Sequence, residues 1–316
     1  MRLFISRPLP EAVLDRARAS FDVTVREETS PLSRAEMLTA LRDYDAVLPT
    51  LRDDFSADVF VEAGAIRAKV LANFGVGYNH IDVAAAKAHG LAVSNTPGAV
   101  TDATADTAMT LILTCARRAG EGERLVRSGS WEGWHPTQML GLHVTGKTLG
   151  VIGMGRIGQA IAHRCHHGFG MEVVFYNRSP KQVDLPARQL GSIEEVCATA
   201  DIVVVATPGG AETTHLIGAD AFHAMQPHAL FVNIARGEVV DEAALIAALQ
   251  AGELAGAGLD VYEFEPEVPE ALIAMENVVL LPHLGTATLE VRTDMGMLAV
   301  ENLEAFARDG TLVTPV

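Results

Sequence analysis

The stretch from residue 148 to residue 158 restricts the possible folds of this chain more than any other. It reads Thr-Leu-Gly-Val-Ile-Gly-Met-Gly-Arg-Ile-Gly, a short apolar run followed by glycines at 153, 155 and 158. The residues after it have a helical pattern, and residues 173–176 have the pattern of a buried strand. A strand, a glycine-rich turn, a helix and a second strand in this order predict a dinucleotide-binding βαβ unit.

Each glycine has its own role in such a unit. Gly153 allows the tight turn, Gly155 lets the backbone approach a pyrophosphate, and Gly158 lets the helix pack closely on the strand. The pyrophosphate would lie at the helix N-terminus, where free N–H groups and the helix dipole favour an anion. We therefore expect this stretch to bind a dinucleotide cofactor.

The end of the second strand indicates which dinucleotide is preferred. When the cofactor is NAD, an acidic residue normally binds the adenosine ribose at this place, but here Asn177 is followed by Arg178 and Ser179. No carboxylate is present there to repel a 2′-phosphate, and a planar guanidinium is suited to bind one. NADP(H) is therefore the expected cofactor, with NAD(H) possible. The alternative is that Arg178 is a solvated surface residue and both cofactors are accepted.

The composition limits the remaining possibilities. A chain of 316 residues suggests two domains, and 49% hydrophobic residues are ample for two cores. The net charge of −16 argues against nucleic acid or an anionic membrane as a partner. No apolar run is long enough to span a membrane, and the N-terminus lacks a signal-peptide pattern. Because Cys115, Cys165 and Cys197 are widely spaced, we expect a cytoplasmic protein without disulfides or a bound metal.

The residues before the glycine-rich turn alternate between strand and helix patterns, which predicts a small parallel α/β domain. Strands are expected at residues 2–7, 21–26, 45–49, 69–73 and 91–94. Helices are expected at 9–19 and 33–42, and a third, alanine-rich helix is expected to end at residue 89. Gly75-Val76-Gly77 forms a turn between one of these strands and a helix, and its backbone N–H groups could bind a small carboxylate. The alternative is an ordinary strand-to-helix turn.

Two further features lie between this region and the glycine-rich turn. A long helical stretch is expected over about residues 102–128, followed by residues 129–147, which have no clear periodicity. Both tryptophans of the chain, Trp131 and Trp134, occur in that second stretch. It could be an arm that packs on a second subunit, or its tryptophans could anchor in a core.

After the glycine-rich turn, three successive strands end close to residues that can carry chemistry. Arg236 follows the strand at 230–234, Glu265 follows the strand at 257–261, and His283 follows the strand at 278–281. The carboxyl ends of parallel strands share one edge of a sheet, where ligands bind. All three side chains can therefore converge on a bound cofactor.

These residue types suit the reduction of a carbonyl by hydride transfer. The developing alkoxide needs a proton, which His283 can supply because an imidazole titrates near neutrality. Glu265 can hold that imidazole in one orientation. Arg236 stays charged and can contact a carboxylate and its neighbouring carbonyl together.

The chain as a whole resembles the D-isomer-specific 2-hydroxyacid dehydrogenase family, and most closely its glyoxylate/hydroxypyruvate reductase branch. The resemblance covers nearly the whole chain. The motifs that carry it are Asn-Phe-Gly-Val-Gly-Tyr-Asn-His-Ile-Asp at 73–82, Val-Ile-Gly-Met-Gly-Arg-Ile-Gly at 151–158, Asn-Ile-Ala-Arg-Gly at 233–237, Gly-Leu-Asp-Val-Tyr at 258–262, Glu-Pro at 265–266 and Pro-His-Leu-Gly at 282–285.

The resemblance implies a role for individual residues. His283 would be the acid/base, Glu265 its partner and Arg236 the cation that orients the substrate. Val76 and Gly77 would bind the substrate carboxylate, with Leu51 in the substrate pocket. The cofactor would contact Thr104, Gly153, Gly155, Arg156, Ile157, Gly158, Asn177, Arg178, Ser179, Thr207, Pro208, Ile234, Asp260 and His283.

The resemblance also implies two Rossmann-like, doubly wound parallel-sheet domains. Residues 1–98 and 286–316 would form a flavodoxin-like substrate (lid) domain. Residues 99–285 would form the NAD(P)-binding Rossmann domain, with a homodimer built through residues 100–147. The expected activity is NADPH-preferring reduction of glyoxylate, hydroxypyruvate or a similar 2-keto acid to the D-2-hydroxy acid. The alternatives on this scaffold are a dehydrogenase for an aromatic 2-keto acid or phosphite, and a dinucleotide-sensing corepressor.

Overall fold

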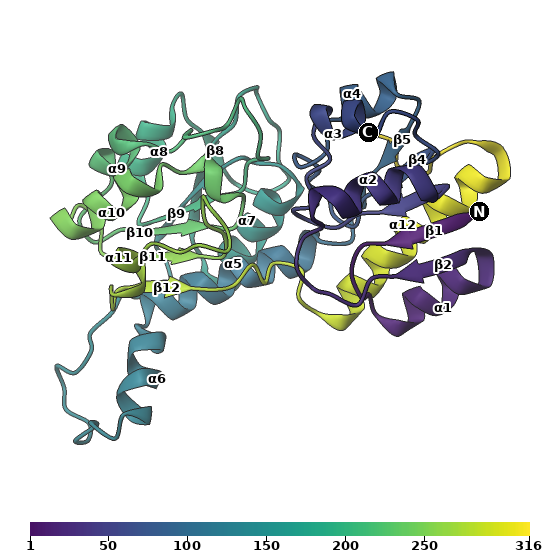
Figure 1. Ribbon diagram of the computed structural model, residues 1–316. Helices are drawn as coiled ribbons and strands as arrows, with labels where there is room; N and C mark the ends of the chain where they lie inside the picture. Colours follow the sequence, from purple (N-terminus) through teal and green to yellow (C-terminus); the bar gives the residue numbers. More distant parts are fainter. The chain divides into compact units, whose positions relative to one another are not determined.

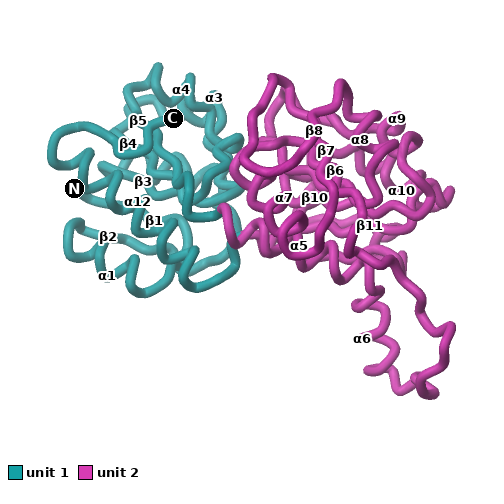
Figure 2. Tube along the Cα trace, turned by 180° about the vertical axis from the view of Figure 1, so that it is seen from behind, with its two compact units in different colours: residues 1–100, 286–316 teal, residues 101–285 magenta.

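The computed structural model describes all of residues 1–316, and the chain divides into two compact units (Figure 2). Unit 1 comprises Met1–Val100 and Thr286–Val316, and unit 2 comprises Thr101–Gly285. Both units contain a parallel sheet with helices on both faces, so the predicted α/β class with two doubly wound sheets is confirmed. None of the helices is both long enough and apolar enough to cross a membrane.

Unit 1 is built on a five-stranded sheet with the order β2-β1-β3-β4-β5, which is the flavodoxin-like order (Figure 2). All of its neighbouring strands are parallel. Its elements are β1 (Arg2–Ile5), α1 (Glu11–Ser20), β2 (Asp22–Val25), α2 (Arg34–Asp43), β3 (Ala46–Leu48), α3 (Ala57–Ala63), β4 (Val70–Ala72), α4 (Val83–Ala88), β5 (Ala92–Ser94) and α12 (Leu289–Asp309).

Two apolar layers cover the sheet of unit 1. Helices α1 and α12 pack together over one face, and α2, α3 and α4 cover the other. The predicted start of α2 is confirmed. Ser33 caps the helix and Glu36 accepts the Ser33 N–H at 2.7 Å, which completes a capping box.

Unit 2 is built on a seven-stranded parallel sheet with the order β12-β11-β10-β9-β6-β7-β8. The order reverses between β6 and β9, which is where doubly wound sheets bind their ligands. Its elements are α5 (Thr101–Ala116), α6 (Ala119–Arg127), β6 (Thr148–Ile152), α7 (Arg156–Phe169), β7 (Glu172–Tyr176), β8 (Arg188–Gln189), α8 (Ile193–Thr199), β9 (Ile202–Val205), α9 (Ala219–Ala224), β10 (Leu230–Asn233), α10 (Glu242–Ala251), β11 (Gly256–Leu259), α11 (Glu270–Ile273) and β12 (Val278–Leu280).

Helices α5 and α7 pack on one face of this sheet, and α8, α9 and α10 pack on the other. Close packing of α5 depends on small residues in the sheet. A Cβ at Gly258 of β11 would lie 3.0 Å from Cys115 Sγ and from Leu111 Cβ. The two cores fix the strand ends, and therefore the loops that follow them.

The long helical stretch expected over about residues 102–128 is present but interrupted, because α5 ends at Ala116 and α6 begins at Ala119. Arg118 between them has a left-handed backbone with φ 50°. The Leu142 N–H donates to the Ala116 carbonyl at 2.8 Å, and a Cβ at Gly141 would lie 2.1 Å from that oxygen. The segment at residues 141–142 therefore binds and packs against the last carbonyl of α5. Because this segment is distant in sequence, no local pattern indicates where α5 ends.

Candidate functional site

The glycine-rich turn joins β6 to α7 and requires glycine for steric reasons. Gly153 has φ 98°, and a Cβ there would lie 2.9 Å from the carbonyl carbon and oxygen of Ala206. A Cβ at Gly158 would lie only 2.2 Å from the Gly153 carbonyl oxygen. At Gly155, in contrast, a Cβ would meet no atom within 4 Å. The first and third glycines are thus needed for packing, and the second borders open space.

The surroundings of this turn fit a dinucleotide. No side chain caps the N-terminus of α7, where Gly155 is followed by Arg156 and Ile157, so the first-turn N–H groups are open to an anion. The buried Thr207 hydroxyl has no hydrogen-bond partner in the protein. Its Cγ2 lies 2.9 Å from the Cβ position of Gly153, so it borders the turn. An uncapped helix and an unsatisfied hydroxyl are what a bound pyrophosphate and sugar would satisfy.

Other predicted cofactor residues follow neighbouring strands of the same sheet or lie in α5. Pro208 follows Thr207 after β9, and its carbonyl accepts the Thr213 hydroxyl at 2.8 Å. Ile234 is buried at the end of β10. The Thr104 hydroxyl, in α5, donates to the Gly285 carbonyl at 3.2 Å.

The loop after β7 is held by its own side chains. The Asn177 amide donates to the Ser179 carbonyl at 2.9 Å, and the Gln189 amide donates to the Asn177 carbonyl at 3.0 Å. Arg178 is 86% exposed, and its Nη1 lies 2.6 Å from Oε2 of Glu212. The predicted phosphate-binding guanidinium is therefore on the surface and is paired with Glu212, a carboxylate on a different loop.

His283 and Glu265 lie together, although 18 positions separate them in the sequence. His283 Nδ1 is 3.0 Å from Glu265 Oε2 and 3.2 Å from Oε1, and the Tyr262 N–H donates to Oε1 at 3.2 Å. Burial acts to raise the pKa of Glu265. The hydrogen bond and charge of His283, the Tyr262 N–H and the Arg236 charge outweigh this, so the pKa lies below its usual value. The carboxylate is therefore ionised at neutral pH.

Asp260 holds the turn that contains His283. Its backbone carbonyl accepts the His283 N–H at 2.9 Å, and its carboxylate accepts the N–H groups of Leu284 at 2.6 Å and Gly285 at 2.8 Å. His283 has a left-handed backbone with φ 56°, which costs energy in a residue other than glycine. Burial raises the pKa of Asp260, and the two N–H groups oppose that rise. Both carboxylate oxygens of Asp260 thus serve the histidine turn.

Arg236 follows β10, and its guanidinium Nη1 donates to the Ala235 carbonyl at 2.7 Å. The Asn233 amide donates to the Arg236 carbonyl at 3.1 Å, which fixes the backbone. Burial lowers the pKa of Arg236, and the negative charges of Glu238 and Glu265 oppose this. The cation is therefore close enough to Glu265 to interact with its charge.

In unit 1, the carbonyls of the turn at Gly75-Val76-Gly77 accept hydrogen bonds within the protein, whereas two of its backbone N–H groups make none. The Asn73 side-chain amide donates to the carbonyls of Gly75 and Gly77, at 3.1 and 3.0 Å. The Asn95 amide donates to the Val76 carbonyl at 2.8 Å. The N–H groups of Val76 and Gly77 donate to no protein atom. Two open N–H groups in one turn are able to bind a small anion.

Leu51 lies in the same unit, in the turn after β3. Its carbonyl accepts Arg7 Nη1 at 2.9 Å, and the buried Asp53 carboxylate accepts the Thr50 N–H at 2.8 Å. The neighbouring β4 end is aligned with this turn, because Thr50 and Phe74 form a parallel bridge. The turn that contains Leu51 therefore begins beside Phe74, the residue that precedes the Gly75-Val76-Gly77 turn.

Several residues that organise these sites received no individual role from the sequence. Glu212 has no local signal, since its partner Arg178 is distant in the chain. Asn73 and Asn95 follow the ends of β4 and β5, and Tyr262 follows β11, so the rule that strand ends carry function could have identified them.

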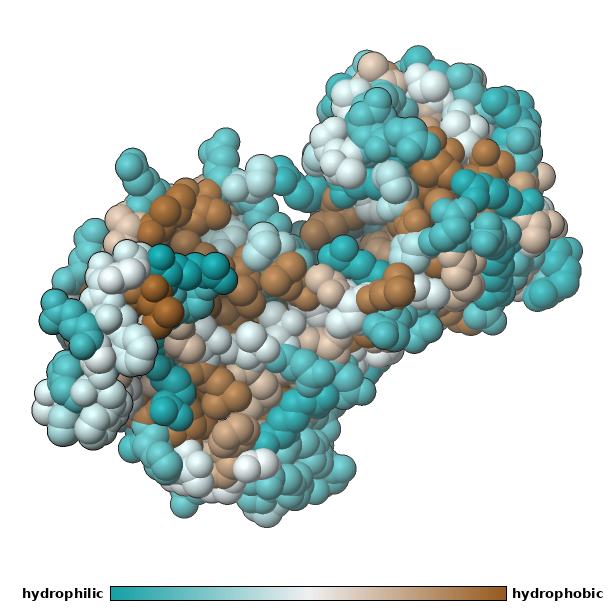
Figure 3. Space-filling view, turned by 90° about the horizontal axis from the view of Figure 1, so that it is seen from below, coloured by the Kyte–Doolittle hydropathy of each residue, from teal (hydrophilic) through white to brown (hydrophobic).

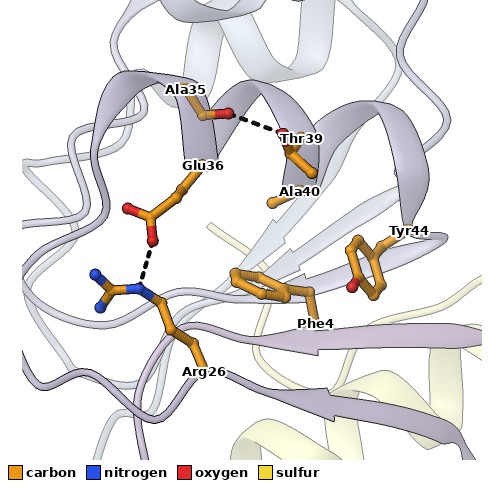
Figure 4. Close-up of a pocket in the computed structure, with 7 residues that line it drawn as sticks. All are labelled: Phe4, Arg26, Ala35, Glu36, Thr39, Ala40 and Tyr44. Atoms are coloured by element: carbon orange, nitrogen blue, oxygen red, sulfur yellow. Dashed lines mark hydrogen bonds and ion pairs between the residues drawn. The ribbon is translucent and has the colours of Figure 1, made fainter.

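A pocket of about 320 Å³ in unit 1 involves none of the predicted site residues. Figure 4 shows Arg26 and Glu36 at one side of it and the rings of Phe4 and Tyr44 at the other. Arg26 Nε is 2.7 Å from Glu36 Oε1, and hydrogen bonds from Ser33, with this cation, lower the pKa of Glu36 to about 2. Because its polar groups are already paired with each other, we assign this pocket no role.

The segment after α5 has exposed apolar residues. Helix α6 and the following loop extend away from the sheet of unit 2 (Figure 1). Trp134 is 79% exposed, Trp131 is 51% exposed, and Val126 and Leu140 are also exposed. Figure 3 shows hydrophobic patches on this unit, at the left of the view. The tryptophans are therefore not anchored in the core of this chain.

Comparisons with known proteins all point to one family. Residues 109–285 match the family described as D-isomer specific 2-hydroxyacid dehydrogenase, NAD binding domain. A glyoxylate reductase of Thermococcus gammatolerans is 44% identical over 312 residues, which cover 96% of this chain and 92% of that protein. A crystal structure of a Thermus thermophilus protein has a TM-score of 0.93 and 42% identity, with 100% of both chains covered. An NADPH-dependent glyoxylate/hydroxypyruvate reductase from Sinorhizobium meliloti, solved with NADP and malonate, has a TM-score of 0.88 and 36% identity. The match between the two covers 100% of this chain and 96% of the Sinorhizobium meliloti chain.

Proposed function

The chain belongs to the D-isomer specific 2-hydroxyacid dehydrogenase family, as an NAD(P)-dependent oxidoreductase, and we propose that it is an NADPH-preferring reductase of small 2-keto acids. Its substrates are of the glyoxylate and hydroxypyruvate type, and its products are D-2-hydroxy acids. The observation that carries this proposal is the His283–Glu265 pair, at 3.0 Å, on the sheet edge that holds the glycine-rich turn. Relatives and solved structures described as glyoxylate reductases support the substrate class.

The nicotinamide cofactor, when bound, supplies the hydride that reduces the carbonyl carbon. The glycine-rich turn, the first turn of α7 and the Thr207 hydroxyl would hold the cofactor. His283 keeps its Nδ1 on Glu265 and gives the proton on Nε2 to the carbonyl oxygen as that oxygen becomes an alcohol. Arg236 orients the substrate and stabilises the negative charge that develops on the same oxygen. Glu265 remains ionised and compensates the charge of the histidine before the proton leaves.

Unit 1 acts as the substrate domain in this proposal. The open N–H groups of Val76 and Gly77 bind the substrate carboxylate, with Leu51 in the pocket. The carbonyls of the turn are already engaged by Asn73 and Asn95, so an anion meets donors there and few free acceptors. This supports an acid substrate over an uncharged carbonyl compound.

The preference for NADPH rests on the loop after β7. Arg178 offers a guanidinium where the 2′-phosphate would lie, and Asn177 and Ser179 carry no negative charge. The relative that was solved with NADP is described as NADPH-dependent, which supports the same preference here.

We further propose a homodimer that is built through the arm at residues 100–147. Its exposed tryptophans and apolar residues are the kind of surface that a second subunit covers.

The test is the initial rate of reduction of glyoxylate, hydroxypyruvate, pyruvate and phenylpyruvate, each with NADPH and with NADH. Fast reduction of glyoxylate or hydroxypyruvate with NADPH is expected. A preference for NADH would remove the role given to Arg178 but keep the enzyme class. A preference for phenylpyruvate would indicate an aromatic 2-keto acid reductase instead. Cofactor binding without turnover of any keto acid would favour a dinucleotide-sensing corepressor or a different substrate.

A further inference from the structure

The ion pair between Arg178 and Glu212 joins two loops that flank the cofactor-binding turn. Arg178 follows β7, and Glu212 lies in the loop at residues 207–215 after β9. In the sheet, β7 and β9 are the two neighbours of β6, whose carboxyl end leads into Gly153. Arg178 Nη1 and Glu212 Oε2 are 2.6 Å apart, so the pair connects loops from both sides of the strand that presents the pyrophosphate site.

Hydrogen bonds hold the backbone of each loop. In the loop that contains Glu212, the Thr213 hydroxyl donates to the Pro208 carbonyl at 2.8 Å, and the Thr213 N–H donates to the Gly210 carbonyl at 2.9 Å. The His215 N–H then ties the end of the loop to the Glu238 carbonyl at 2.8 Å. On the other side, Gln189 accepts the Lys181 N–H and donates to the Asn177 and Ser179 carbonyls. The backbone at Glu212 is therefore placed by the fold, within reach of Arg178.

From this geometry we propose that Glu212 is a cofactor-specificity residue that competes with the 2′-phosphate of NADP(H) for Arg178. The inference rests on the proposed function, in which Arg178 binds that phosphate. A phosphate monoester carries nearly two negative charges at neutral pH, and it would enter beside a carboxylate. Arg178 must leave Glu212 or share its donors, and the two anions repel each other. NADH has no such group, so its binding does not require this exchange.

The exchange is feasible because the ion pair is exposed. Both side chains are more than 80% exposed, at 86% and 81%, and such a pair contributes little to stability. Glu212 therefore lowers the affinity for NADPH without abolishing it, and it narrows the difference in affinity between NADPH and NADH. A chain that favours NADP(H) can thereby retain some use of NAD(H).

The test is the dissociation constant of NADPH and of NADH for wild type, E212Q, R178Q and the double variant, measured by quenching of intrinsic fluorescence at fixed low ionic strength. The matched control is E276Q, because Glu276 is also an exposed carboxylate of unit 2 paired with an arginine, Arg124. It makes the same change in net charge at a pair elsewhere in the unit.

We expect E212Q to bind NADPH roughly 3- to 10-fold more tightly, with NADH within twofold of wild type. E276Q should change neither constant. In the R178Q background, the E212Q substitution should no longer tighten NADPH binding, since the shared cation is gone. If E212Q leaves NADPH binding unchanged while R178Q weakens it, the role of Glu212 is overturned and that of Arg178 stands. If R178Q weakens neither cofactor selectively, the assignment of Arg178, and with it this inference, is overturned.

Discussion

The Nδ1 atom of His283 lies 3.0 Å from Oε2 of Glu265, while the Nε2 atom of the same ring makes no hydrogen bond within the protein. This pairing sets the orientation of the ring, and Nε2 is the nitrogen that would donate a proton under the proposed function. On its backbone side, His283 is held by Asp260 in a left-handed conformation with φ 56°. One histidine is thus positioned by two carboxylate residues, and each can be tested by itself.

Replacing Glu265 by glutamine removes the charge but keeps a hydrogen-bonding group of the same size. We expect kcat to fall by about 10- to 100-fold, because the charge that supports the histidine is lost. E267Q, two positions away at an exposed carboxylate, should leave kcat unchanged. Equal kcat values for E265Q and wild type across the pH range would remove Glu265 from the mechanism.

The substitution E265Q should also change how the stability of the protein depends on pH. The pKa of Glu265 in the folded protein lies below its usual value of 4.5. The stabilisation from its ionised form is therefore complete above that pH and is lost as the pH falls through the folded-state pKa. The difference in Tm between wild type and E265Q should be largest near neutral pH and should shrink below pH 4.5. A difference that grows on acidification would contradict the sign of this shift.

Asp260 should act through the histidine turn. In D260N, the amide can accept only one of the two N–H groups from Leu284 and Gly285, which leaves a half-buried or buried donor unsatisfied at a cost of about 1–3 kcal/mol. We expect a lower Tm without cofactor and a lower kcat, measured by thermal denaturation and initial rates. The exposed Asp220 in α9 provides the control D220N. A normal Tm combined with weaker binding of NADPH would instead assign Asp260 to the nicotinamide alone.

Two glycines of α7 provide a matched pair of alanine substitutions. In G158A, the new Cβ would lie 2.2 Å from the Gly153 carbonyl oxygen, so helix and turn must separate at a cost of about 1–3 kcal/mol. Binding of NADPH should weaken together with stability. In G168A, the Cβ meets no atom within 4 Å, so the helix should keep or gain up to about 1 kcal/mol. Equal denaturation curves for the two variants would show that the helix does not need this close approach.

The arm should hold the subunits together. Replacing Trp131 and Trp134 by serine removes large apolar surface that is exposed in a single chain. Sedimentation velocity should show a dimer for wild type and a shift to monomer for the double variant. The control is V61S, which changes an exposed apolar residue of α3 in unit 1. A wild-type protein that is monomeric at all concentrations would exclude the proposed arm contact.

Local patterns predicted much of this molecule because its site is built from turns that directly follow strands. Gly153 and Gly158 have the steric need expected from the fingerprint. Glu265 and His283 meet because β11 and β12 are adjacent and parallel, so their carboxyl ends lie at one edge. The rule that parallel strands end at one edge of a sheet therefore predicted that Glu265 and His283 lie close together, which their spacing in the sequence does not indicate.

What could not be predicted depends on contacts between segments that are distant in sequence. The end of α5 is set by the Leu142 N–H, which no pattern within residues 102–128 could indicate. The partner of Arg178 is Glu212, on a loop after a different strand. The use of both Asp260 oxygens for the histidine turn likewise follows only from the folded backbone.

The most direct test of the central claim is the NADPH-dependent reduction of hydroxypyruvate by wild type and by H283N, followed by chiral analysis of the product. Binding of NADPH is measured for both proteins, so that a loss of chemistry is distinguished from a loss of cofactor. The account predicts rapid formation of the D-hydroxy acid by wild type, and a kcat lower by about 100- to 10,000-fold in H283N with cofactor binding retained. An L product, or an H283N variant as active as wild type, would contradict it.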